Sequence, residues 1–430
     1  MRRAMANGSR SLPVLALAAS CATFGFPRAH DEGGNPWVRL DSAHCTLFTN
    51  LDGGDAEDTV RQLELWWMAM ARSLPVGSGG DNPMRVRVVA VRNQWQAAEV
   101  GGGKILGLQF SHPRLGDNLY IGDPTSLVGR ETVRHELGHA FVGAHWSGVP
   151  QWLNEGLASY LQTAEYDEKQ CRVTWGGRSV PQTQEEVVLD HEVSARDLIA
   201  SKPWKEDDVA RYTFHAGLLV HMLVTEHRRE LECYLNALRP RAPAELGVGA
   251  LDRCFPSIGR WDEELADYGT RPRLGFDTKS VTFGPPEITV TSAAATDGDV
   301  HALLAMLDLH MLDFIDPCFH AARLQRASLN LERALDLQPT NELVPPLASA
   351  LAEVDPVLGS RLTLRLTELR PADWRVWLVR ARTPGLAALE ARGACDQVER
   401  LAPEETEAGE LRPCGPAEPP PVSVSRPTKR

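Results

Sequence analysis

The sequence lacks several features that would direct it to particular partners. It has 45 Lys and Arg residues against 57 Asp and Glu, a net charge of −12, and no basic run stands out in its interior. Because binding to nucleic acid or to an anionic membrane surface depends on clustered positive charge, we expect neither as the main partner. The eight cysteines include no CxxC pair, which excludes the commonest thiolate metal motifs.

The first 21 residues have the pattern of an export signal. Arg2, Arg3 and Arg10 supply positive charge around the start of a short apolar segment, SLPVLALAA at 11–19. This segment is too short to cross a bilayer, which takes about 20 residues. The small residues before Cys21 resemble a bacterial lipobox, which implies that Cys21 carries lipid in the mature protein. We expect an exported lipoprotein, periplasmic or at the cell surface, that meets the membrane only through this anchor; plain secretion is the alternative.

The other seven cysteines are interpreted in the light of the expected export. Disulfides form in oxidising compartments, so some of these cysteines should pair. Proximity in the sequence favours Cys233 with Cys254 and Cys395 with Cys414. An odd number of cysteines leaves at least one thiol free or available to a second molecule.

Hydrophobic periodicity predicts both strands and helices between residues 37 and 240. The segment at 55–74 has an apolar stripe with a period of 3.6 residues, which is typical of an amphipathic helix. Asp123, Thr125 or Ser126 can cap a later helix, and Gly143 is placed to end it. The expected strands are 45–50, 84–91 and 119–121, and the expected helices are 55–74, 126–141, one that starts at 150, and 208–238.

Residues 135–139 read His-Glu-Leu-Gly-His and fall within the helix expected at 126–141. Positions i and i+4 of a helix point to the same side, so His135 and His139 can bind one metal ion together. Two imidazoles at this spacing are typical of a zinc site. Glu136 points about 100° away around the helix axis, so it can take a proton from a zinc-bound water without being a ligand. The motif predicts one Zn²⁺ per chain.

A catalytic zinc site needs a third protein ligand, and the sequence offers two candidates. Glu155 lies in VPQWLNEGLASY, on a helix expected to start at Pro150, after a loop long enough to turn the chain back. His145 would nearly complete HExxHxxGxxH, a pattern in which a glycine breaks the helix so that the last histidine reaches the metal. That pattern needs glycine where this chain has Val142, and Gly143 comes one residue late. The spacing favours Glu155, with His145 as the alternative.

The motifs HELGH and WLNEGLASY resemble those of gluzincin zinc metallopeptidases, and most closely the peptidase MA-like domains of bacterial proteins. The resemblance extends over about residues 36–240 and is strongest at 131–160. It implies a small mixed sheet with active-site helices, a peptide or protein substrate, and Glu155 as the third ligand. It also implies that Tyr212, at the start of a later apolar helix, donates a hydrogen bond to the oxyanion. The strand at 118–121 corresponds to an exposed edge that pairs with substrate backbone.

From about residue 300 the sequence is rich in Leu and Ala and predicts helices. The segment ALDLQPTN at 334–341 recurs loosely as RLTELRPAD at 365–373, and Pro339 and Pro371 are 32 residues apart. This spacing resembles the 34-residue period of tetratricopeptide repeats. We expect a degenerate tetratricopeptide-like region that binds a protein partner or limits access to the site; a generic helical bundle is the alternative.

Together these patterns predict an α+β fold followed by an all-α region. The expected segments are an export signal (1–21), a tether (22–36), a zinc metallopeptidase-like domain (37–275), a linker with some strand (276–296), a tetratricopeptide-like helical domain (297–401) and a disordered tail (402–430). The expected function is zinc-dependent hydrolysis of peptide bonds outside the cytoplasm. One alternative is a surface interaction protein with an inactive or structural zinc site, and another is a metzincin-like peptidase with His145 as ligand. Glu136 argues for an enzyme, because a structural site has no use for a base.

Overall fold

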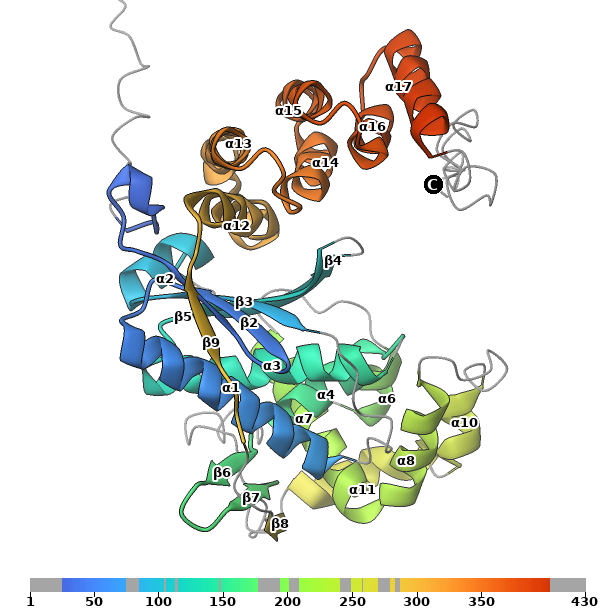
Figure 1. Ribbon diagram of the computed structural model, residues 1–430. Helices are drawn as coiled ribbons and strands as arrows, with labels where there is room; N and C mark the ends of the chain where they lie inside the picture. Colours follow the sequence, from blue (N-terminus) through green and yellow to red (C-terminus); the bar gives the residue numbers. More distant parts are fainter. Residues whose placement is uncertain are drawn as a thin grey trace, which may run out of the picture.

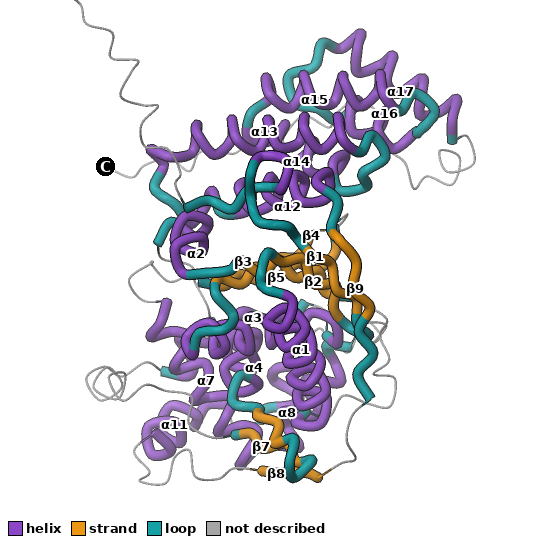
Figure 2. The backbone as a smooth tube through the Cα atoms, turned by 60° about the vertical axis from the view of Figure 1, so that its left-hand side comes forward, coloured by secondary structure: helices purple, strands orange, loops and turns teal. Residues whose placement is uncertain are grey.

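The computed structural model describes residues 25–74, 85–103, 106–112, 115–146, 148–176, 194–200, 209–239, 249–256, 258–269, 279–282 and 287–402. Within them the chain is a mixed α and β structure in which one sheet lies between two groups of helices (Figure 1). Figure 2 shows the C-terminal helices on one face of the sheet and α1, α3, α4 and α7 on the other. The segment expected to be an export signal, with Cys21, and the residues after 402 lie outside the described residues.

The main sheet is mixed, with its strands in the order β4-β5-β3-β2-β1-β9. β2, β3 and β5 run parallel, while β4 pairs antiparallel with β5, β1 with β2, and β9 with β1. The predicted strands at 45–50, 84–91 and 119–121 are confirmed as β2, β3 and β5. The bounds are β1 Val38–Asp41, β2 Cys45–Thr49, β3 Val86–Val91, β4 Gly107–His112, β5 Gly116–Gly122 and β9 Thr291–Ala294.

The strand before the histidine helix is not at the edge of the sheet, so the expectation for 118–121 is wrong on this point. β4 forms a hairpin with β5 and occupies the edge instead. The alternation of Leu108 and Phe110 with Gln109 and Ser111 is the signal that could have located β4. The exposed backbone that faces the histidine helix therefore belongs to β4.

Successive side chains of the central strands point to opposite faces of the sheet and build two cores. In β3, Val86, Val88 and Ala90 belong to the first core, whereas Val89 and Val91 belong to the second. All five are fully buried. Burial on both faces explains why β3 is an almost continuous apolar run.

Helices and a small second sheet enclose the first core. The buried stripe of α1 confirms the predicted amphipathic helix, and α6, α10 and α11 contact α7 and α8. The second sheet has the order β6-β7-β8. The bounds are α1 Gly53–Ser73, α3 Leu127–His145, α4 Gln151–Leu161, α6 Ala195–Ala200, α7 Val209–Glu226, α8 Arg228–Ala237, α10 Ala250–Cys254, α11 Trp261–Gly269, β6 Glu165–Asp167, β7 Arg172–Trp175 and β8 Lys279–Thr282.

Two helix boundaries differ from the predictions. α3 does not end at Gly143 but continues to His145. A glycine costs a helix only about 1 kcal/mol, and the neighbours Val142 and Ala144 are buried in the first core, which offsets this cost. The single helix expected at 208–238 is divided at His227, where the backbone leaves the helical conformation.

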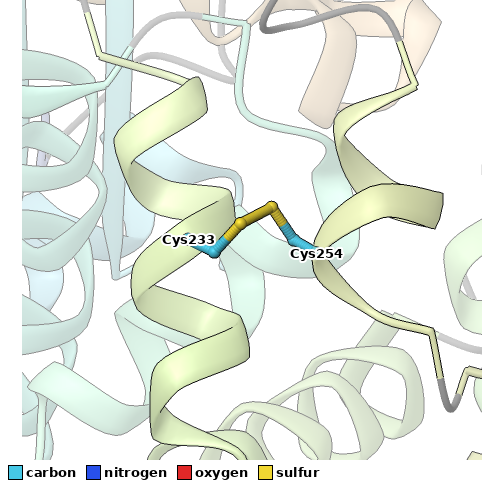
Figure 3. The surroundings of a disulfide bond; sticks show 2 residues. All are labelled: Cys233 and Cys254. Atoms are coloured by element: carbon cyan, nitrogen blue, oxygen red, sulfur yellow. A yellow bond between two sulfur atoms is a disulfide. The ribbon is translucent and has the colours of Figure 1, made fainter.

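The predicted disulfide between Cys233 and Cys254 is confirmed and joins α8 to α10 (Figure 3). Cys395 is also disulfide-bonded, and its expected partner Cys414 lies outside the described residues. Cys45 is a thiol in the first core, where burial raises its pKa well above the usual value and the charge of Glu64 adds to the effect. The closeness of cysteines along the chain was therefore a sound guide for one pair.

The C-terminal region is helical, as predicted, and completes the second core. Consecutive helices pack in pairs, α12 with α13, α14 with α15, and α16 with α17. α12 shares its core with Phe48, Val89 and Tyr120 of the sheet. None of the described helices is long and apolar enough to span a bilayer. The bounds are α2 Gln94–Gly101, α12 Asp297–His310, α13 His320–Leu337, α14 Val344–Val354, α15 Pro356–Leu369, α16 Trp374–Ala381 and α17 Ala388–Leu401.

Residues 25–36 fall in the expected tether but pack against the C-terminal helices. Phe26 is buried in the second core, and the guanidinium of Arg326 lies 3.6 Å from the centre of its ring. Asp31 lies 3.0 Å from Nε2 of His301. These contacts join residues 270 and 300 positions apart (301 − 31 and 326 − 26), so the polar, glycine-rich composition of the segment did not predict them.

A buried ion-pair group joins α12, α13 and α2. The fully buried carboxylate of Asp308 accepts hydrogen bonds from Arg323 at 3.2 Å and from Arg326 at 2.7 Å. Burial raises the pKa of Asp308, and the two arginines oppose this shift. Arg323 also donates to the carbonyl oxygens of Glu99 and Val100 at the end of α2. The group therefore fixes the C-terminal helices to the helix that precedes β4.

Removing the Asp308 carboxylate should destabilise the protein strongly. In Asp308→Ala two largely buried guanidinium groups lose their counter-charge, so we expect the free energy of unfolding to fall by about 3 kcal/mol or more. Denaturant unfolding followed by circular dichroism measures the loss. The control is Asp336→Ala, which removes an exposed pair with Arg365 and should cost at most about 1 kcal/mol. Equal losses in both variants would contradict the role of the buried group.

Candidate metal centre

The two histidines of HELGH lie on one face of α3, as their spacing predicts. Ser126 caps this helix, and its Oγ accepts a hydrogen bond from the N–H of Gly129 at 3.0 Å. His135 and His139 follow one turn apart, and their Nε2 atoms are 3.2 Å from each other. Both side chains are largely buried, with exposed fractions of 18% and 10%. Two ring nitrogens thus converge on one point at the surface of the helix.

Glu155 of α4 completes the group. Its Oε2 lies 3.6 Å from Nε2 of His135 and 3.8 Å from Nε2 of His139. Ligand atoms held at the usual zinc distances with tetrahedral angles are about 3.4 Å apart. The three separations lie on both sides of this value, so a zinc ion fits between the atoms after small side-chain adjustments. Among the described residues, these three form the one group found with metal-ligand geometry.

Two glycines let the helices that carry the site approach backbone to backbone. A Cβ atom at Gly138 of α3 would lie 3.0 Å from Cα of Ala158 on α4. A Cβ atom at Gly156 of α4 would lie 2.5 Å from the carbonyl oxygen of Ala216 on α7. Each glycine is the neighbour of a predicted ligand in the sequence, so two close helix contacts occur beside the metal centre.

Two polar side chains that the sequence analysis did not single out orient the ligands. Nδ1 of His135 donates to Oε1 of Gln162 at 3.0 Å, which leaves Nε2 as the lone-pair nitrogen that faces Glu155. Oγ1 of Thr213 donates to Oε2 of Glu155 at 3.1 Å. Gln162 comes two helical turns after Glu155 and on the same face, and this period was the available signal. Thr213 gave no comparable signal, because it lies on α7, 58 residues further along.

Glu155 and His135 shift each other's pKa values. Burial alone would raise the pKa of Glu155, but the two imidazoles lower it overall. Burial alone would lower the pKa of His135, but Glu155 and Glu136 raise it overall. Nδ1 of His139 is buried and has no hydrogen-bond partner among the described residues. The carboxylate of Glu155 therefore favours a positive charge between the two imidazole rings. A bound metal cation would supply this charge.

Glu136 contacts the edge strand and is not a member of the ligand group. Its Oε2 accepts the backbone N–H of Gln109 on β4 at 2.7 Å. Gly107 permits this approach, because a Cβ atom there would lie 2.5 Å from Cγ2 of Thr132 and 3.0 Å from Cγ of Glu136. The carboxylate is thus held between the sheet edge and α3, next to the first histidine in the sequence. This position suits the role of a base.

The structure does not bring His145 to the ligand group. α3 continues unbroken to this residue, whose Nδ1 donates to the carbonyl oxygen of Phe141 at 2.8 Å. Its ring packs against Phe141 and Trp146. Because the metzincin-like alternative needs the helix to break before its last histidine, the geometry favours Glu155 as the third ligand.

Tyr212 lies in the first core and is 2% exposed. It immediately precedes Thr213, so the helix that carries it does reach the metal centre. The hydrogen bond of Tyr212 to an oxyanion stays a prediction.

No protein-family model, curated protein or solved structure matches the chain. The likeness to gluzincins therefore rests on the two motifs. The structure itself shows a mixed sheet with helices on both faces and a helical C-terminal region.

Replacing Glu155 should remove the metal. Glu155→Ala leaves two imidazoles, which hold zinc weakly, so we expect zinc content to fall from about one per chain to near zero. Mass spectrometry of the metal after gel filtration measures the content, and circular dichroism verifies the fold. His145→Ala is the matched control and should keep its zinc. The opposite result, zinc lost from the His145 variant alone, would establish the metzincin-like ligand set.

A side chain at Gly138 should push the ligands apart. Gly138→Val places methyl groups against the backbone of α4, so we expect zinc affinity to fall by about 10- to 100-fold, the usual effect of disturbing the support of a ligand. Competition with a zinc chelator measures the affinity. Gly143→Val on the same helix is the control, because its Cβ meets nothing within 4 Å. Similar affinities for the two variants would disprove the need for close helix contact.

Proposed function

We propose that the chain is an exported zinc-dependent peptidase of gluzincin type that binds one Zn²⁺ through His135, His139 and Glu155. The supporting observation is the near-tetrahedral spacing of three donor atoms, with Glu136 beside them but outside the group. Structural zinc sites almost always have four protein ligands, whereas catalytic sites have three and an open position. The ion would supply a Lewis acid and a bound water with a pKa near ~7.

Glu136 is the residue that moves protons in this proposal. Because its Oε2 is held by the N–H of Gln109, Oε1 is the atom that takes a proton as water attacks the peptide carbonyl. The same carboxyl then gives the proton to the leaving nitrogen, so the C–N bond breaks and a carboxylate and an amine result. A positioned base of this kind contributes about 10²- to 10⁴-fold to the rate.

The edge of β4 is the surface for an extended peptide. In an antiparallel pair, alternate residues turn their backbone groups away from the partner strand. The N–H of Gln109 meets Glu136 and not β5, so Gly107, Gln109 and Ser111 are the outward-facing residues. The N–H of Gln109 is bonded to Glu136, so a peptide would pair with the carbonyl oxygen of Gln109 and with the backbone groups of Gly107 and Ser111. It would add a strand beside the metal centre. Such pairing gives affinity through backbone atoms and little selectivity for side chains.

Three further parts of the proposal are supported by sequence patterns alone. Tyr212 is the oxyanion donor, Cys21 carries the lipid anchor, and the C-terminal helices bind a protein partner. The competing proposal is a surface interaction protein in which the zinc site is inactive. Hydrolysis that depends on Glu136 separates the two.

Glu136→Gln should abolish hydrolysis but keep zinc. The amide cannot accept the proton, so we expect kcat for a casein or peptide-library substrate to fall by about 10²- to 10⁴-fold, with zinc still near one per chain. Glu131→Gln, an exposed change on the same helix, is the control and should retain full activity. If wild type and both variants are equally inactive on broad substrates, the scaffold proposal is favoured.

A further inference from the structure

We propose, on the basis of the function above, that Phe110 and His310 are a positioning pair through which the C-terminal helical region holds β4 against Glu136. The helical region would then be part of the catalytic unit and more than a surface for partners. Neither residue touches the ligand group, and each acts through the backbone of β4. In both views of the backbone β4 lies on the side of the sheet that faces the C-terminal helices (Figures 1 and 2).

The sheet supports β4 on one side only. It is an edge strand, and β5 is its one neighbour in the sheet. On the face toward α3, Nε2 of Gln109 donates to Oγ of Ser111 at 3.0 Å, and Ser111 donates to Asp117. These bonds join parts of one hairpin, so they do not fix the hairpin relative to the rest of the protein.

The opposite face of β4 contacts α12. The ring of Phe110 stacks on the ring of His310, with centroids 4.0 Å apart and planes inclined by 24°. Leu108, on the same face, also packs against the second core. His310 is the last residue of α12, and its Nδ1 donates to the carbonyl oxygen of Met306 at 2.9 Å. Its own helix therefore sets the orientation of the imidazole against which Phe110 packs.

The end of α12 is a firm support for this contact. Asp308, two residues before His310, is the fully buried centre of the ion-pair group that joins α12 to α13 and α2. The turn after α2 meets the same region, because a Cβ atom at Gly102 would lie 2.9 Å from Cγ2 of Ile315. Gly102, shortly before β4, and Phe110, within β4, therefore both contact the segment at and just after the end of α12.

The position of β4 determines the geometry at Glu136. The 2.7 Å hydrogen bond from Gln109 ends on the carboxylate, and the outward backbone groups of the same strand would align the substrate. A displacement of β4 by about 1 Å would change both at once, and misplacement on this scale can cost up to about 100-fold in rate. The stack of Phe110 on His310 opposes this displacement from the side away from α3.

Hydrogen exchange and kinetics on the full chain test the pair. In Phe110→Ala and His310→Ala we expect faster amide exchange in residues 106–112 and unchanged exchange in α3. Zinc content should stay near one per chain, and kcat/KM for a peptide substrate should fall about 10-fold or more. The conservative variant His310→Phe keeps an aromatic ring and should restore both slow exchange and kcat/KM. Phe319→Ala, an exposed phenylalanine at the start of α13, is the control and should behave as wild type.

The exchange measurement does not depend on activity. If the wild type cleaves no peptide but exchange in 106–112 responds as expected, the peptidase proposal fails while the support of β4 stands. If exchange in 106–112 is the same in His310→Ala as in wild type, the positioning role is overturned. A uniform rise of exchange throughout the protein would also overturn it, because the stack would then serve general stability. Should Phe110→Ala not fold, the comparison of His310→Ala with His310→Phe decides.

Discussion

Helices α3, α4 and α7 touch backbone to backbone at Gly138 and Gly156, and the donor atoms meet because of this contact. Packed helices usually have axes 8–10 Å apart, with side chains between them. Three ligands about 3.4 Å apart leave little room for such a layer. The glycine in HELGH and the glycine after the ligand Glu155 are thus as much a part of the metal centre as the ligands. They also bring Thr213 and Gln162 within reach of the atoms that they orient.

The sheet connects this arrangement to the rest of the chain. Its strands supply alternate side chains to two cores, so helices from both ends of the sequence rest on the same layer. The helices with the ligands cover one face, and α12 with its partners covers the other. β4 lies between them, with Gln109 toward Glu136 and Phe110 toward His310. A displacement of α12 would therefore move the edge strand β4 through the contact of His310 with Phe110, without moving the ligand helices.

The local parts of the site could be predicted from the sequence. The i, i+4 spacing fixed the common face of His135 and His139, and WLNEGLASY located Glu155 on the next helix. The distant parts could not, because contacts such as that of Asp31 with His301 follow from tertiary packing and leave no periodic pattern. The prediction that the helix ends at Gly143 failed for a related reason. The burial of the neighbouring residues outweighs the weak intrinsic preference of glycine against helix. The alternation of apolar and polar residues in β4 is visible in the sequence and could have located this strand.

The packed segment at residues 25–36 has a geometric consequence for a lipid-anchored protein. Three residues separate Cys21 from Gly25, and a fully extended chain of four residue steps reaches about 14 Å. If Cys21 carries lipid, the body cannot swing freely above the bilayer, and the side where Phe26 packs beneath Arg326 would face the headgroups. The ligand helices lie across the sheet from that side (Figure 2). The metal centre, which those helices carry, would then lie across the sheet from the bilayer, on the side of the molecule turned to the aqueous phase.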